Sequence, residues 1–305
     1  MDSKLHISVS PHIRSKKSTK DIMLDVIIAL IPATVAAVIL FGLPALWLVI
    51  ACVASAVLGE ALFYKVLKKE LPIGDLSAVV TGLLLALNLS ANVPVWQAVI
   101  GSLFAIIIVK CFFGGIGCNV VNPAITGRVF MLIAFGSMAQ SAFPLDSVAT
   151  ATPLVELAEG NTPALLDLFI GNVGGCIGET SALALLIGFV YLLVRKVISW
   201  HIPTVYVATV FLFTLAVKGD LTVALAYILS GGLLLGAIFM ATDYVTSPST
   251  PWGKVIFGVG AGVITVLIRF WGNYPEGVSF AILLMNILNP FIEKWTPRKV
   301  FGGQK

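Results

Sequence analysis

The sequence predicts an all-α integral membrane protein with about ten transmembrane helices, and three observations support this. Of its 305 residues 58% are hydrophobic and only 11% are charged, whereas soluble proteins average about 25% charged residues. Apolar runs of the roughly 20 residues that cross a bilayer as a helix recur along nearly the whole chain. None of these runs alternates polar and apolar residues as porin strands do. Helices, which satisfy their backbone internally, are therefore expected.

The apolar runs place ten spans in order along the chain and divide it into five parts. The spans are expected near residues 24–41, 46–67, 77–89, 95–113, 121–139, 176–197, 204–217, 222–242, 255–270 and 278–292. The parts are an N-terminal segment (1–20), a first five-helix repeat (21–139), a loop (140–175), a second five-helix repeat (176–293) and a C-terminal tail (294–305). The basic N-terminal segment lacks the apolar core of a cleavable signal peptide.

Lysines and arginines cluster at one set of span ends, which predicts the orientation. They are Arg14, Lys16, Lys17, Lys20, Lys65, Lys68, Lys69, Lys110, Arg195, Lys196, Lys254, Lys294, Arg298 and Lys299. The positive-inside rule makes this side cytoplasmic, together with both termini. The loop of residues 140–175 then faces outside, and it contains four acidic residues and no lysine or arginine.

Two glycine-containing stretches read as distant copies of one another. Residues 81–88 end in Asn88 before Pro94, and residues 231–236 lead through Asp243 to Pro248. They end the third and eighth spans, five helices apart, and a tandem repeat of an odd number of helices must have inverted topology. Glycine faces that simply pack closely would explain the glycines, but not Asn88 and Asp243.

A second polar stretch holds Asn119, Asn122 and Arg128, where the chain re-enters the membrane. Two amides with an arginine beyond them can hold a polar planar ring through several hydrogen bonds. Alternatively, Asn122 caps a helix that starts at Pro123, and Arg128 pairs with a carboxylate or reaches the interface. The stretch itself leaves both interpretations open.

The hydroxyl-rich stretch from Asp146 to Leu154 separates the two apolar halves. It either offers an accessible threonine for chemistry or forms a turn that caps a short helix at Thr152 and Pro153. The four cysteines form no metal-ligand pattern and are expected to be buried thiols. No nucleotide-binding motif follows a strand, so a dinucleotide-binding fold is not expected. The expected environment is membrane lipid, and no nucleic-acid partner is expected.

Four motifs in order resemble the family that contains the D subunit of the Rnf electron-transport complex and the B subunit of the sodium-pumping NADH:quinone reductase. They are CNVVNPAITGR (118–128), ATATPL (149–154), FMATD (239–243) and YPEG (274–277). The likeness runs from about residue 10 to residue 291. The short segment before the first span is more similar to the Rnf protein, because the quinone-reductase protein usually has a longer extension.

This resemblance implies two flavins. One is flavin mononucleotide (FMN) esterified through its phosphate to Thr152, attached by a separate flavin transferase that reads Asp146. The recognition pattern departs from the family at Ala149, which leaves Thr150 as a rival acceptor. The other is a noncovalent riboflavin near the polar membrane elements, for which the candidates are Asn119, Asn122, Arg128 and Asp243.

The function implied is that of an electron-carrying membrane subunit of a ferredoxin:NAD⁺ oxidoreductase that moves Na⁺ or H⁺. Such a subunit is not catalytic alone: it works with the other Rnf subunits, through which it meets ferredoxin and NAD, in the cytoplasmic membrane of a bacterium or archaeon. Ionisable or polar groups in a bilayer are costly without a partner, so the candidates for an ion path are Asp75, Asn88, Asp243 and Glu276. Each could equally cap a helix.

Two other classes of function stay open at this stage. Inverted repeats and broken helices also occur in secondary transporters of small solutes or ions, and a fold alone does not decide function. A structural subunit that docks redox partners is the second class. Within the redox interpretation, a protein like the B subunit of the quinone reductase is also an alternative. A covalent flavin separates the redox interpretations from the others.

Overall fold

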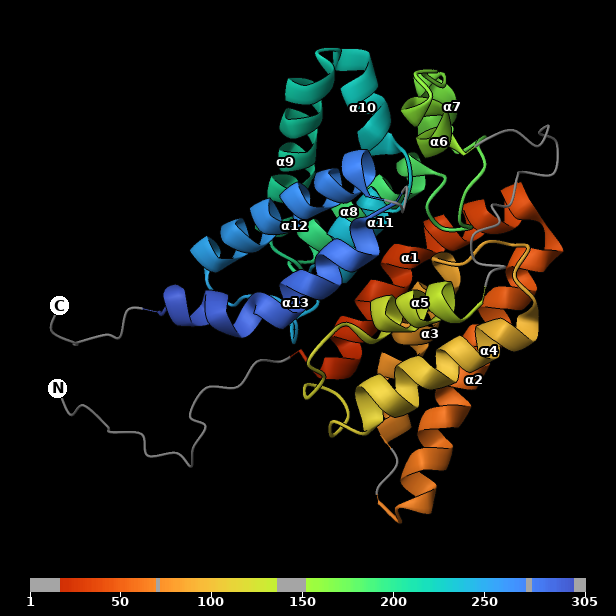
Figure 1. The fold of residues 1–305 in the computed structure, drawn as a ribbon. Coiled ribbons are helices and arrows are strands. Elements are labelled where there is room, and N and C mark those ends of the chain that lie inside the picture. Colours follow the sequence, from red (N-terminus) through yellow and green to blue (C-terminus); the bar gives the residue numbers. More distant parts are fainter. Residues whose placement is uncertain (1–16, 70–71, 136–151, 273–275, 299–305) are drawn as a thin grey trace, which may run out of the picture.

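The computed structural model describes residues 17–69, 72–135, 152–272 and 276–298, and within them it contains helices and no β-strand (Figure 1). The first half of the chain forms five membrane elements with a short connecting turn. They are α1 (Thr19–Phe41), α2 (Leu43–Val66), the 3₁₀ turn η1 (Pro72–Asp75), α3 (Ser77–Leu87), α4 (Val95–Leu103) continuing into the π-helix η2 (Phe104–Cys111), and α5 (Pro123–Ala134). The all-helical prediction is confirmed for this part of the protein.

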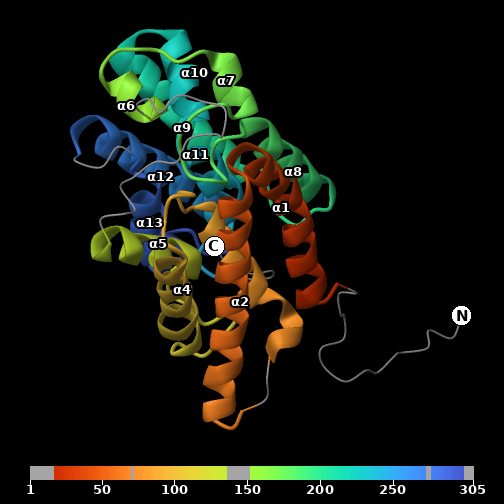
Figure 2. The same cartoon turned by 90° about the vertical axis from the view of Figure 1, so that its right-hand side faces the viewer.

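The second half also consists of long and interrupted helices, and it begins after two short ones. The short helices are α6 (Pro153–Ala158) and α7 (Leu165–Ile170), which stand beside α10 in both views (Figure 2). The others are α8 (Ala182–Val194), α9 (His201–Lys218), α10 (Leu221–Leu229), α11 (Leu233–Leu235) with the π-helix η4 (Gly236–Met240), α12 (Pro251–Trp271) and α13 (Val278–Trp295).

Several of the predicted spans are shorter than expected. In the described residues four helices are long and apolar enough to cross a membrane, namely α1, α2, α9 and α12, and α10 with α11 and η4 forms a fifth that is bent by 64°. Helix α3 has 11 residues, so it rises only about 16 Å and covers half of a hydrocarbon core. The fifth span ends at Ala134 rather than at residue 139, and the sixth begins at Ala182 rather than at Cys176.

The eighth span was expected to be interrupted toward Asp243, at the end of its glycine-containing stretch, but the structure breaks it earlier, at Ser230, Gly231 and Gly232. Gly231 has φ +66°, a backbone conformation that favours glycine. The carbonyls that the break leaves unpaired are met by Arg269 of α12, which donates to Tyr227 O at 2.6 Å and to Ser230 O at 3.2 Å. A broken helix is tolerated at membrane depth because this buried guanidinium satisfies its carbonyls.

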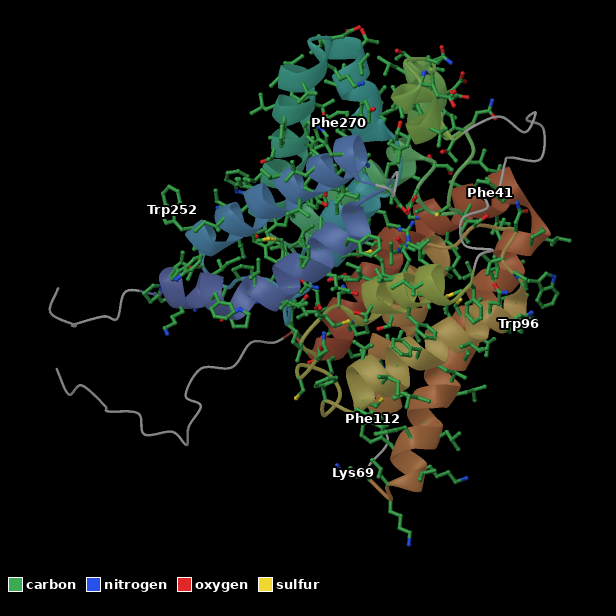
Figure 3. The ribbon with its side chains drawn as sticks, viewed as in Figure 1. Phe41, Lys69, Trp96, Phe112, Trp252 and Phe270 are labelled. Carbon is green, nitrogen blue, oxygen red and sulfur yellow. The ribbon has the colours of Figure 1, made fainter. Side chains whose placement is uncertain are left out.

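The tryptophans mark the two membrane interfaces. All six are exposed, and most lie at or next to a helix end: Trp47, Trp96, Trp200, Trp252, Trp271 and Trp295. Trp252 and Trp271 mark opposite ends of α12, and Figure 3 shows Trp252 and Trp96 on different sides of the molecule. Exposed tryptophans at helix ends are typical of the headgroup regions of a bilayer. The chain is a multi-pass membrane protein.

The two halves meet along two helix pairs, α1 with α8 and α5 with α13, while α2 packs on α3 and α4, and α9 packs on α12. The crossing of α1 and α8 depends on Gly188. A Cβ atom at this position would meet the backbone oxygen of Ala29 and would lie 2.9 Å from Phe239 Cζ. The small residue therefore lets the two helix backbones approach closely, as in other membrane helix pairs.

Replacing Gly188 by alanine is expected to lower the free energy of unfolding by about 1–3 kcal/mol, because the methyl group overpacks the α1–α8 crossing. Thermal unfolding of the purified protein in detergent measures the change. The matched control is Gly74→Ala, since a Cβ atom at Gly74 meets nothing within 4 Å, and its effect is expected to stay within about 0.5 kcal/mol. Equal melting temperatures for the two variants would contradict the packing assigned to Gly188.

Candidate functional site

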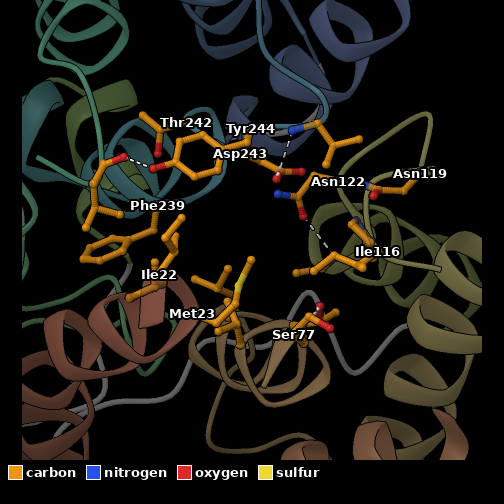
Figure 4. A pocket seen from close by; sticks show the side chains of 18 of the residues that line it. Ile22, Met23, Ser77, Ile116, Asn119, Asn122, Phe239, Thr242, Asp243 and Tyr244 are labelled. Atoms are coloured by element: carbon orange, nitrogen blue, oxygen red, sulfur yellow. Dashed lines mark hydrogen bonds between the residues drawn. The ribbon is translucent and has the colours of Figure 1, made fainter. Parts of the chain in front are cut away.

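A cavity of about 390 Å³ lies between the two halves of the protein (Figure 4). It is bounded by the start of α1, by α3, by residues 116–124 and by residues 238–245. Most of its wall is apolar, with Ile22, Met23, Leu84 and Phe239 among the lining side chains. A largely apolar pocket of this size with a few polar groups is typical of a site for a small organic cofactor.

The polar edge of the cavity is formed by Asn119 and Asp243. Asn119 donates to Val121 O at 3.1 Å, and its side chain lines the cavity together with Asp243. That carboxylate accepts from the Thr246 hydroxyl at 3.1 Å and from the Val245 backbone N–H at 3.4 Å. Asp243 is therefore held in place by a turn of its own loop, and one side of it faces the cavity.

Asn122 combines the capping role with a contact between the halves. Its side-chain oxygen accepts from the backbone N–H groups of Ala124 and Ile125 at 3.0 and 3.3 Å, which caps α5 in front of Pro123. Its amide nitrogen donates to Met240 O at 3.2 Å, at the end of η4. The start of α5 is thus fixed to the end of the broken helix of the other half, and both line the cavity.

Arg128, one turn and a half further along α5, lies outside this cavity, in a buried polar network. Its Nη1 donates to Asn88 Oδ1 at 2.5 Å and to Glu179 Oε1 at 2.7 Å. Its Nη2 donates to Glu276 and lies 3.5 Å from Cys176 Sγ. The guanidinium side chain is only 7% exposed. One arginine therefore joins the end of α3, the segment before α8 and the segment before α13.

A second buried ion pair borders the cavity from the first half. Lys110 of η2 donates to Glu60 of α2 at 2.7 Å and to the Ser77 hydroxyl at 2.5 Å. The Ser77 hydroxyl and backbone N–H both donate to Asp75, just before the start of α3. Lys110 was predicted to lie at a cytoplasmic span end, but it is 3% exposed, so it is a partner for Glu60 rather than a loop charge.

Thr152 is the N-cap residue of α6, but its hydroxyl makes no capping hydrogen bond, and the turn is closed by its backbone oxygen at 2.8 and 3.0 Å. The helix behind it is anchored, because Leu154 and Leu157 are buried in a small apolar cluster with Tyr227 of α10. A partly exposed threonine thus stands at the start of a segment that is packed against α10. Asp146, Ala149 and Thr150 lie outside the described residues.

The predicted site residues therefore fall into separate groups. Asn119, Asn122 and Asp243 come together at the cavity, and Arg128 does not join them. Of the ion-path candidates, Asn88 and Glu276 meet at Arg128, while Asp75 lies with Ser77 and Lys110.

Four charged residues of these networks were not predicted as site residues: Glu60, Lys110, Glu179 and Arg269. Of these, only Lys110 had been named, at a cytoplasmic span end. Each stands in or beside an apolar run, which is the signal that could have identified them. Glu179 was assigned to the interior of the sixth span, and the structure has it in the non-helical segment before α8. Its partner Arg128 is 51 residues away in the sequence, and hydropathy does not reveal such a pairing.

The comparison with protein families identifies the chain. Residues 6–302 match the model of the NQR2, RnfD, RnfE family. The chain belongs to this family. Its match covers both halves of the fold and all of the polar groups described above.

Three similar proteins carry names of one type, each the D subunit of a translocating complex. That of the Na⁺-translocating ferredoxin:NAD⁺ oxidoreductase complex of Acetobacterium woodii is 52% identical, over 99% of this chain and 96% of that protein. That of the proton-translocating ferredoxin:NAD⁺ oxidoreductase complex of Clostridium ljungdahlii is 41% identical, over 98% and 96%. That of an ion-translocating oxidoreductase complex of Stutzerimonas stutzeri is 41% identical, over 94% and 93%.

Removing the charge of Arg128 is expected to destabilise the protein strongly. Arg128→Gln leaves Glu179 and Glu276 without their cation, and breaking a buried ion pair in this way costs about 3–5 kcal/mol. Thermal unfolding in detergent is the measurement. Arg298→Gln is the control, because Arg298 is exposed and donates to Ser249 O at 3.4 Å; a change within about 0.5 kcal/mol is expected there. Similar losses in both variants would contradict the role of Arg128.

Proposed function

We propose that this chain is the membrane electron-transfer subunit of an Rnf-type ferredoxin:NAD⁺ oxidoreductase that couples electron flow to Na⁺ or H⁺ translocation. The observation that carries this proposal is the full-length similarity, at 52% and 41% identity, to two proteins named as the D subunits of such complexes. The buried polar networks support it, because charged groups within a membrane protein are typical of ion-translocating machinery. The other subunits of the complex are the expected partners, and ferredoxin and NAD are reached through them.

The proposal is tested with inverted membrane vesicles from the organism that carries the chain. Addition of reduced ferredoxin and NAD⁺ should produce NADH and drive Na⁺ or H⁺ into the vesicles. Both activities should be lost when the gene for this chain is deleted and should return when it is restored. Ferredoxin-dependent NADH formation that continues undiminished in the deletion strain would contradict the function.

The proposed orientation has both termini in the cytoplasm and Thr152 on the opposite side. The charges that support it lie after α2, after α8, before α12 and after α13, and Figure 3 shows Lys69 far from Phe41 at the other end of the first half. Lys218, at the end of α9, is an exception on the outer side; it lies 5.4 Å from the ring of Phe270. Single exceptions do not reverse a strong charge bias.

Cysteine labelling tests this orientation. Cysteines are introduced singly at Lys69 and at Glu159, both exposed, in a background in which the four native cysteines are replaced. An impermeant thiol reagent should label the Glu159 position in intact cells and the Lys69 position only in inverted vesicles. Labelling of both positions from one side would require a different number of spans.

We further propose that the membrane region consists of two inverted five-helix repeats. The order of elements along the chain supports this. In that order, α1 to α5 of the first half have as counterparts α8, α9, the broken α10–η4 helix, α12 and α13 of the second half. The contacts also support it, because α1 packs on its counterpart α8 and α5 packs on its counterpart α13. Such pairs lie on the axis that would relate the repeats, and transporters of this type bind ligands between them.

For the covalent cofactor we propose FMN on Thr152. A phosphoester needs an accessible hydroxyl; Thr152 is partly exposed, and its hydroxyl is not used in capping α6. The segment is packed against α10 through Leu154 and Leu157, and Pro153 is buried beside them. A group attached to Thr152 would therefore be held at a fixed position relative to α10. Flavin supplies the electron chemistry, while the protein sets distance, potential and solvent access. Asp146 is proposed as the residue that the flavin transferase reads.

The acceptor is tested by in-gel flavin fluorescence of the denatured protein, because only a covalent link survives denaturation. Thr152→Ala should abolish the fluorescence and leave membrane insertion intact. Thr152→Ser should retain at least part of it, since serine supplies the same hydroxyl. Thr150→Ala is the matched control and should be labelled normally. A fluorescent Thr152→Ala protein would exclude this residue as the acceptor.

For the noncovalent riboflavin we propose the cavity between the halves. Its volume of about 390 Å³ lies within the usual range for small-molecule sites. Its apolar wall suits the faces of a flat ring, and Asn119, Asn122 and Asp243 offer hydrogen bonds to its edge. Arg128 is not part of this proposal, because it is fully engaged with Asn88, Glu179 and Glu276.

Asn119 is the sharper probe of this cavity, because Asn122 also caps α5. Asn119→Ala removes hydrogen bonds to a bound ring, each worth about 1 kcal/mol, and should lower extractable riboflavin several-fold without changing the Thr152 fluorescence. The control is Asn161→Ala, an exposed asparagine in the α6–α7 connection. Unchanged riboflavin in a folded Asn119→Ala protein would place the ring elsewhere.

A further inference from the structure

Two carboxyl groups meet above the break in the eighth span. A Cβ atom built on Gly232 would lie 2.5 Å from Glu179 Oε1 and 2.7 Å from Glu276 Oε1, so both oxygens face the same glycine. Arg128 bridges the two side chains, donating to Glu179 with one nitrogen and to Glu276 with the other. Glu179 is 5% exposed, and Glu276 Oε1 is closed off from solvent with no hydrogen-bond partner among the described residues.

The cations around this pair are already engaged. Arg128 donates one nitrogen to Glu179 and the other to Glu276 Oε2. Arg269 donates to the backbone oxygen of Glu276 at 3.2 Å and to the carbonyls of Tyr227 and Ser230. Neither arginine offers a donor to Glu276 Oε1.

Among the described residues, the other titratable groups nearby do not donate to Glu276 Oε1 either. The Cys176 thiol lies on the Arg128 side, 3.5 Å from Nη2. The Tyr206 hydroxyl is bonded to Thr265 at 2.6 Å. A proton between the two acids would give this oxygen of Glu276 a hydrogen-bond donor.

Two neighbouring carboxylates repel each other strongly in the low-dielectric interior of a protein, and such a pair can bind one proton between its two members. We propose that Glu179 and Glu276 share a single exchangeable proton, clamped by Arg128 at the break of the eighth span. The proton is the hydrogen-bond donor that Glu276 Oε1 otherwise lacks. This inference rests on the proposed function, because it assigns a proton site to the ion path of the complex.

The surroundings of the pair indicate how the proton exchanges with solvent and which segment lies next to it. The Glu276 side chain is 27% exposed and that of Glu179 is 5% exposed, so exchange with solvent proceeds through Glu276. Leu154 packs on Gly231 at the same break, since a Cβ atom there would lie 2.7 Å from its Cδ1. The proton site thus lies beneath the segment that begins at Thr152, the proposed flavin acceptor.

The test is infrared difference spectroscopy of the purified complex as the buffer is changed from alkaline to acidic. A protonated carboxylic acid gives a carbonyl band that moves to lower frequency in D₂O. One such band is expected in the wild type, and it should be absent from both Glu179→Gln and Glu276→Gln. Glu159→Gln, which removes an exposed acid of the same outer region, is the matched control and should keep the band.

Other outcomes would overturn the proposal. These are no band in the wild type, or a band that persists in either glutamine variant, since a shared proton requires both acids. A band that disappears when Na⁺ is raised at constant pH would identify Na⁺ as the occupant instead. The spectra need neither ferredoxin nor NAD⁺, so failure of the proposed function and failure of this inference are distinguishable.

The glutamine variants are expected to fold, because an amide N–H can replace the shared proton as donor to the remaining carboxylate. Thermal melting of each complex checks this. If one of them does not assemble, Glu276→Asp gives a second test: it keeps the charge opposite Arg128 but withdraws the oxygen from Glu179. The band should then shift in frequency, and an unshifted band would contradict the shared proton.

Discussion

The structure depends on keeping one charge, the guanidinium of Arg128, satisfied inside the membrane. Removing an arginine from water costs several kcal/mol unless partners with good geometry surround it. Its fork meets Asn88 at the end of α3, Glu179 before α8 and Glu276 before α13. These three segments are non-helical at membrane depth, which is tolerated only where protein groups satisfy them. One side chain thus accounts for where three interrupted elements of both halves converge.

The same requirement explains the rest of the buried polar chemistry. Arg269 satisfies the carbonyls of the broken α10, and Asn122 caps α5 while it binds the end of η4. Lys110 and Glu60 neutralise each other beside the cavity. The resulting architecture separates two polar regions: a cavity with an amide and carboxylate edge, and a charged network under the Thr152 segment. We propose that flavin chemistry uses the first region and the Thr152 segment, and that proton movement uses the network.

Much of the fold could be predicted from the sequence, because a membrane helix is recognised from its own apolar run. Apolar runs located the long helices α1, α2, α9 and α12, Asn122 before Pro123 marked the start of α5, and a glycine-containing stretch at residues 231–236 was singled out close to the break of the eighth span. Helix length could not be predicted for α3, α5 and α8, since an apolar residue is compatible with either a helix or a buried non-helical segment. The pairing of Arg128 with Glu276, 148 residues away, is a tertiary fact that no local pattern contains. Asn119, Asn122 and Asp243, which the family resemblance grouped as riboflavin candidates, line one cavity, whereas Arg128, grouped with them, lies outside it with partners that were not predicted.

The most direct test of this account is a double-mutant cycle on Arg128 and Glu179. The free energies of unfolding of the wild type, Arg128→Gln, Glu179→Gln and the double variant are compared in the same detergent. If the arginine is the clamp between the halves, the second substitution costs much less once the first is present, with a coupling energy of about 2 kcal/mol or more. Losses that add within about 0.5 kcal/mol would show that the two residues act independently and would contradict the central role of this interaction.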